Sequence, residues 1–179
     1  MTQTALIEAA QAGDSEAFAS LLNVCYDTIF RFAFKWSGHR ADAEDIAQLA
    51  CLKLATGLSQ FRFDAAFSSW LYRLVINCAK DWQKSQARHR GVEDSTLVFD
   101  KLSVSDGPET GIYLRQILEQ ADSMGEGFKE TLLLVFAEGL THRESAIILG
   151  IKESTVSWRI HEIRKRFNLL QKPEGGNTE

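Results

Sequence analysis

The chain has 179 residues and is 45% hydrophobic, enough for the core of one domain or of two small ones. Its net charge is −4. Its apolar runs are far too short to cross a bilayer, so we expect no membrane insertion. The N-terminus has no basic segment followed by a long apolar stretch, which predicts a cytoplasmic location. With only 2 prolines and many strong helix formers, the composition favours an all-α fold.

The reactive side chains form no catalytic or metal-binding pattern. Cys25, Cys51 and Cys78 are scattered through apolar helical patterns, and their odd number argues against a disulfide framework. We interpret them as buried structural thiols. The 4 histidines have no ligand spacing, and the chain has neither a glycine-rich phosphate loop nor a nucleophile elbow. The sequence therefore predicts a protein that binds no cofactor and no metal and that is not an enzyme.

The first half of the chain has the apolar spacing of a series of helices. The predicted helices span residues 4–22, 23–37, 42–58 and 66–88. Gly13 and Asp14 mark either an interruption or a new cap in the first of them, and Gly38 breaks the second. A loop that begins at residue 57 precedes the last helix.

Two of these helices have distinct polar faces. In 42–58, Asp42, Asp45 and Gln48 recur every three residues at the start of the helix, where the helix dipole favours acidic groups, and taken alone they indicate a solvated helix start. In 66–88, the polar face lies opposite the apolar stripe. This polar face consists of Asn77, Lys80, Asp81, Lys84 and Arg88. Lysine and arginine neutralise phosphates and asparagine bonds to base edges, so the second face suits nucleic acid.

Aromatic residues gather at the start of the 66–88 helix. Phe67 and Trp70 have core spacing and are predicted to be buried. Phe61 and Phe63, with Arg62 between them, lie in the preceding loop. They either pack within the domain or form the wall of a pocket.

Periodicity fades between residues 91 and 111, an acidic segment that holds one of the two prolines. We predict a flexible acidic linker here. It joins a helical domain over residues 1–90 to a second helical domain over 112–170. A disordered tail is predicted over 171–179.

Charge is distributed unevenly along the chain. Residues 58–90 carry a net charge of +4 and residues 141–167 carry +3, whereas residues 91–140 carry −7. Salt screens exposed charges beyond about 8 Å, so nucleic acid responds to a local basic patch and not to the total charge. The acidic total therefore does not exclude nucleic-acid binding.

Residues 141–167 predict a helix, a tight turn and a second, basic helix. Thr141 and Glu144 form a capping-box start, and Gly150 ends the first helix. Ser154 or Thr155 is predicted to cap the second helix. This arrangement is typical of a helix-turn-helix, although an antiparallel helix pair in a bundle has the same periodicity.

The second helix has one apolar and one polar face. Its apolar face consists of Val156, Ile160, Ile163 and Phe167. The candidate DNA contacts are Thr155, Ser157, Trp158, Arg159, His161, Glu162 and Lys165. A helix that is buried on one side and polar or cationic on the other is what reading of the major groove requires.

Three segments, in this order, resemble bacterial RNA polymerase sigma factors of the extracytoplasmic-function (ECF), two-domain group. DAEDIAQ at 42–48 is similar to the helix that grips the polymerase core. FRFDAAFSSWLYRLVINCAKDWQKSQARHR at 61–90 is similar to the segment that melts and reads the downstream (−10) promoter box. EGLTHRESAIILGIKESTVSWRIHEIRKRF at 138–167 is similar to the module that reads the upstream (−35) box. The resemblance covers about residues 5–170.

The resemblance implies an initiation factor that recruits RNA polymerase core to promoters and opens promoter DNA. Asp42, Asp45 and Gln48 would then contact the core. Phe61 to Phe63 would lie at a pocket for a flipped base, and the polar face of 66–88 would complete the melting surface. An anti-sigma factor is a further implied partner, which the linker would allow to clamp both domains.

Two other functions are compatible with part of the sequence. A helix-turn-helix transcriptional regulator without a melting role would need only residues 141–167. A protein-interaction module that mimics a sigma factor would need neither basic helix. Residues 42–90 distinguish these functions from the first, because a plain regulator has no reason to combine an acidic core-binding helix with a basic melting helix.

Overall fold

The computed structural model describes residues 2–90 and 108–170, and all regular structure within these ranges is helical. The all-α prediction is therefore confirmed. The chain divides into two compact units, residues 1–112 and 113–179. The tail predicted at 171–179 and most of the linker predicted at 91–111 lie outside the described residues. No helix of the described ranges combines the length and the apolar character that crossing a bilayer requires.

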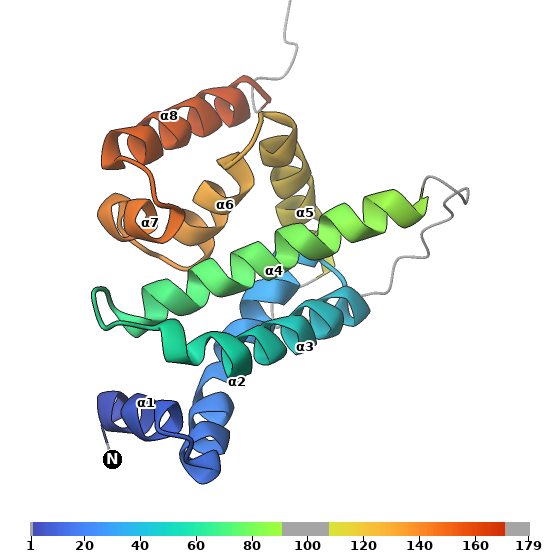
Figure 1. Cartoon of the computed structure of the whole chain (residues 1–179). Helices are drawn as coiled ribbons and strands as arrows, with labels where there is room; N and C mark the ends of the chain where they lie inside the picture. Colours follow the sequence, from blue (N-terminus) through green and yellow to red (C-terminus); the bar gives the residue numbers. More distant parts are fainter. Residues whose placement is uncertain (1, 91–107, 171–179) are drawn as a thin grey trace, which may run out of the picture. The chain divides into compact units, whose positions relative to one another are not determined.

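The first unit is a helical bundle (Figure 1). Its elements are α1 (Gln3–Gln11), α2 (Ser15–Ser37), α3 (Arg40–Gly57), the 3₁₀ turn η1 (Leu58–Gln60) and α4 (Phe67–Arg90). The long helices α2, α3 and α4 pack against one another, and α1 packs against α2. Their fully buried side chains include Leu21, Ile29, Phe32, Ile46, Leu54 and Val75. This core holds α3 beside α4 and so decides which of their polar side chains meet.

The ends of α2 show why the chain turns where it does. The Asp14 carboxylate accepts hydrogen bonds from the backbone N–H groups of Glu16 and Ala17, so Gly13 and Asp14 form a new cap. Gly38 then ends α2 at a φ of 73°, a left-handed conformation that glycine adopts without strain. The break predicted at this glycine is confirmed.

The second unit contains the helix-turn-helix. Its elements are most of α5 (Pro108–Ser123), α6 (Phe128–Leu132), the π-helical turn η2 (Leu133–Ala137), α7 (His142–Leu149) and α8 (Glu153–Leu170). Thr141 and Glu144 form the predicted capping box, in which each side chain accepts from the other's backbone N–H. Hydrogen bonds from Thr141 hold the pKa of Glu144 below its ordinary value. Gly150 ends α7 at a φ of 66°.

Two helix starts differ from the sequence prediction. α8 begins at Glu153, and the carbonyl of Lys152 accepts hydrogen bonds from the backbone N–H groups of Thr155 and Val156. Ser154 and Thr155 therefore lie in the first turn and do not cap it. α5 begins at Pro108, ahead of residue 112, where the second helical domain was predicted to start. Proline suits the first turn of a helix, because the N–H that it lacks would have no partner there.

Candidate nucleic-acid interface

The acidic face of α3 lies on the surface. Asp45 and Gln48 are exposed and Asp42 is half-buried. Leu52 continues this face one turn further along and is 67% exposed. Sequence reasoning missed this leucine, although its spacing from Gln48 could have shown it. The face thus combines acidic, amide and apolar groups, the mixture that protein interfaces use.

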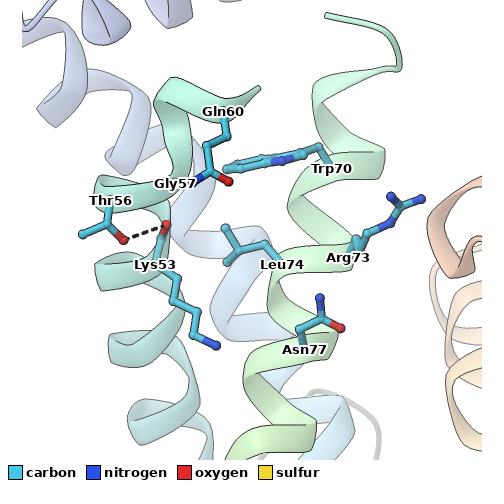
Figure 2. Close-up of a pocket in the computed structure, with 8 residues that line it drawn as sticks. All are labelled: Lys53, Thr56, Gly57, Gln60, Trp70, Arg73, Leu74 and Asn77. Atoms are coloured by element: carbon cyan, nitrogen blue, oxygen red, sulfur yellow. Dashed lines mark hydrogen bonds between the residues drawn. The ribbon is translucent and has the colours of Figure 1, made fainter. Parts of the chain in front are cut away.

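An open pocket of about 410 Å³ lies between α3 and α4 (Figure 2). It is lined by Lys53, Thr56, Gly57, Gln60, Trp70, Arg73, Leu74 and Asn77. In Figure 2 the flat ring of Trp70 extends from α4 toward Gly57 and Gln60, and Lys53 and Asn77 border the other end of the opening. An aromatic ring can stack on a base, an amide can bond to a base edge and a cation can neutralise a phosphate. The lining therefore suits single-stranded nucleic acid.

Of the predicted site residues, Asn77 lines this pocket, and the rest of its lining was missed. Trp70 was predicted to be buried, but it is half-buried and faces the opening. A signal was present in the sequence, because Trp70, Arg73 and Asn77 follow one another at helical spacing and lead on to Lys80 and Lys84. The contribution of α3 had no comparable signal.

An ion pair joins α3 to α4 beside the pocket. The Lys53 ammonium on α3 lies 2.7 Å from the carboxylate of Asp81 on α4. This hydrogen bond raises the pKa of Lys53 above its ordinary value. The two side chains are 42% and 56% exposed, so the pair stabilises the fold by no more than about 1 kcal/mol. Asp81, a predicted DNA contact, is thus engaged within the protein.

The loop before α4 places Phe61 and Phe63 in different surroundings. Phe61 is 6% exposed, and its ring lies 4.7 Å from that of Phe63 and 5.7 Å from that of Trp70. The Gln11 amide donates to the carbonyls of Leu58 and Phe61, each at 2.8 Å, and so ties the loop to α1. Phe61 is therefore a packing residue, whereas Phe63 is 42% exposed.

The backbone at Phe63 is strained. Its φ is 60°, a left-handed conformation that a bulky side chain rarely adopts. Such strain costs on the order of 1–3 kcal/mol and persists only where the surroundings impose it. The loop thereby presents an aromatic ring at the surface, next to the exposed Arg62.

The remaining predicted residues of α4 follow the pocket along the helix. Lys80 is half-buried, and Lys84 and Arg88 are exposed. Phe67 is 6% exposed, as its core spacing predicted. The cationic side chains thus continue from the pocket toward the end of α4.

In the second unit, α8 exposes most of the predicted contacts. Ser157, Trp158, His161 and Lys165 are exposed, whereas Thr155 and Glu162 are half-buried. The Ser157 hydroxyl lies 2.9 Å from Nδ1 of His142, which links α8 to the start of α7. The apolar face of the helix is in the core, with Val156, Ile160 and Ile163 almost fully buried.

Arg159 turns inward and does not share the exposed face of α8. Its Nη1 donates to the carbonyl of Gly127 at 3.2 Å and to the Thr131 hydroxyl at 3.4 Å. Its guanidinium also lies 5.8 Å from the centre of the Phe128 ring. The arginine that the sequence placed among the DNA contacts therefore joins α8 to α6.

The cysteines are free thiols, as predicted, and Cys25 and Cys78 are buried. Burial raises the pKa of each of these two thiols to about 11. Cys51 is half-buried, and its pKa is raised for the same reason. Among the described residues, no group of three or more histidine, cysteine or acidic side chains is placed to hold a metal ion.

Comparison with known proteins shows the family to which this chain belongs. The Sigma-70 region 2 family model matches residues 21–89, which span most of α2, all of α3 and all but the last residue of α4. The ECF RNA polymerase sigma-E factor of Escherichia coli is 30% identical over 97% of this chain and 96% of its own length. The chain belongs to the ECF sigma factors.

Other sigma factors are similar over different shares of their length. The ECF sigma factor SigE of Mycolicibacterium smegmatis is 30% identical over 93% of this chain. The chain spans 66% of that relative and 43% of the probable sigma factor RfaY of Xanthomonas campestris.

Among solved structures, CnrH in complex with the cytosolic domain of CnrY has a TM-score of 0.68 at 20% identity, covering 95% of this chain and 97% of CnrH. RpoE of Bartonella quintana, in complex with the anti-sigma factor NepR, has a TM-score of 0.63 at 20% identity, covering 88% of this chain and 98% of RpoE. These two structures share the fold of this chain.

Proposed function

We propose that this ECF sigma factor binds RNA polymerase core, directs it to specific promoters and opens the DNA there. Family membership supports the activity, and the pocket between α3 and α4 is the observation that carries the opening step. In this layout, residues 1–90 bind the core and melt the downstream box, and 112–170 read the upstream box. Residues 91–111 link the two domains.

The pocket supports opening of the DNA because its side chains can replace the pairing and stacking interactions that an extruded base loses. Unpairing and unstacking one base costs a few kcal/mol. Stacking of a base on an aromatic ring such as Trp70 contributes about 1–3 kcal/mol. The Asn77 amide can bond to the base edge, while Lys80, Lys84 and Arg88 can neutralise phosphates along α4. Together these groups favour the open strand over the closed duplex.

The other two surfaces serve recruitment. Asp45, Gln48 and Leu52 on α3 form the core-binding surface, where acidic groups would steer association with a basic partner. The exposed side of α8, with Ser157 and Lys165, reads the upstream duplex through the major groove. An anti-sigma factor is included in the proposal, because a sigma factor of similar fold, RpoE, was solved in complex with one.

The experiment compares strand opening with closed binding. Holoenzyme is assembled from polymerase core and the full chain, and unpaired promoter thymines are detected with permanganate. The double variant Asn77→Ala/Lys80→Ala should form closed complexes through α8 but lose the reactive thymines. Ser68→Ala, which changes an exposed residue of α4 outside the pocket lining, is the matched control and should open DNA normally. If the unaltered protein with core gives no reactive thymines at promoters that it binds, a helix-turn-helix regulator without a melting role replaces this proposal.

A further inference from the structure

Trp158 is an unusual group for the surface that it occupies. It is 53% exposed, and among the described side chains of α8 it is the one large apolar group that is exposed. Its exposed neighbours on the helix, Ser157, His161 and Lys165, are all polar. An apolar ring in a polar reading face can offer a partner an apolar contact.

The ring of Trp158 is held on a fixed support. It packs edge-to-face against Phe128, with the ring centres 5.5 Å apart and the planes at 64°. Phe128 is 7% exposed and is the first residue of α6, which packs against α8. Trp158 therefore has little conformational freedom left to lose when it binds a partner.

Its place in the helix favours a contact with bases. α8 begins at Glu153, so Trp158 lies in the second turn, within the part of a recognition helix that meets base edges. The adjacent cation, Arg159, is turned toward Gly127, so it does not compete with the indole ring of Trp158 for contacts on the exposed face of α8.

We propose that Trp158 reads the C5-methyl group of a thymine in the upstream promoter box. The inference rests on the proposed function, since it names what α8 recognises there. The C5-methyl group is the apolar group that base edges present in the major groove, among hydrogen-bond donors and acceptors. Contact between the indole ring and this methyl group removes both from water, whereas cytosine at the same position offers no methyl group.

The test removes only the methyl group. Holoenzyme made from the full chain and polymerase core selects upstream boxes from a randomised promoter pool. Each thymine of the selected box is then replaced in turn by deoxyuridine, and the affinity of each duplex is measured. Deoxyuridine at one position should weaken binding roughly fourfold, the effect of withdrawing one methyl-sized group from an apolar contact.

Two variants assign the effect to a residue. Trp158→Ala should bind the thymine and deoxyuridine duplexes equally well, whereas His161→Ala should bind both more weakly and keep their ratio. The ratio compares two duplexes on one protein, so a general loss of stability or affinity cancels.

A selected box without thymine, the absence of any methyl effect in the unaltered protein, or a methyl effect that persists in Trp158→Ala would each overturn the inference. Promoter opening would still stand in those cases, and the exposed ring would then serve a protein partner or the packing of α6. Selection of no upstream box at all would refute recruitment through α8, and this inference with it.

Discussion

Replacing Gly127 by alanine tests how the recognition helix is held in place. Gly127 has a φ of 87°, and a Cβ atom added to it would lie 2.5 Å from Cζ of Arg159 and in collision with Nη1. The guanidinium group is the end of a flexible side chain, so it would swing away while the backbone stays. The variant therefore removes the interactions of Arg159 with α6 without changing that residue.

The magnitude follows from the hydrogen bonds and the ring contact that Arg159 makes. Its hydrogen bonds to Gly127 and Thr131 are long and partly buried, and each contributes about 0.5–1.5 kcal/mol. The interaction with the Phe128 ring adds about 0.5–1 kcal/mol, and hydration of the released guanidinium offsets part of the destabilisation. We expect a net destabilisation of about 1–2 kcal/mol beyond the roughly 1 kcal/mol of strain that any alanine incurs in a left-handed conformation.

Gly139→Ala is the matched control. Its φ is 68°, and a Cβ atom there would meet nothing within 4 Å, so this variant has the backbone strain without the collision. Hydrogen exchange of the slowest amides of α8 measures the free energy of opening of the second unit in the full chain. Gly127→Ala should lower that free energy by about 1–2 kcal/mol more than Gly139→Ala does.

The Arg159→Ala background completes the thermodynamic cycle. There, Gly127→Ala has no guanidinium group to displace and should cost only the backbone strain. Equal costs at Gly127 and Gly139, or an unchanged cost at Gly127 in this background, would refute the conclusion that Arg159 fastens α8 to α6.

Three further predictions concern the first unit. Asp45→Arg should weaken association with polymerase core about tenfold at low salt and less at high salt, with unchanged helix content; unaltered affinity would exclude this face of α3. Asp81→Ala should strengthen binding to single-stranded DNA and steepen its salt dependence, because it frees the Lys53 ammonium; weaker binding would show that Asp81 itself contacts the strand. Because the pKa of Cys25 and Cys78 is raised from 9.0 to about 11, the unfolded chain loses these thiol protons first, so the free energy of unfolding should fall as pH rises from 9 to 11. Urea titrations should show a flatter fall in the Cys25→Ala/Cys78→Ala variant, and an identical fall would exclude the thiols as its cause.

The elements that the sequence predicted correctly depend on short-range interactions. The cap at Asp14, the stop at Gly38 and the capping box of Thr141 each involve groups within four residues of one another. The same holds for the apolar stripe of α8, where Val156 and Ile160 recur at the helical repeat and are buried. Such signals are complete within one stretch of chain, so the helices and their polar faces could be read without a structure.

Partners from different helices were decided by the tertiary structure. Lys53 and Asp81 pair across 28 positions of the chain, and Arg159 reaches Gly127 across 32. Whether a long polar side chain turns to solvent or to a neighbouring helix depends on which backbone carbonyl or carboxylate that helix brings within reach. Helical periodicity assigns a side chain to a face, but only the packing of α3 on α4 and of α6 on α8 determines what that face meets.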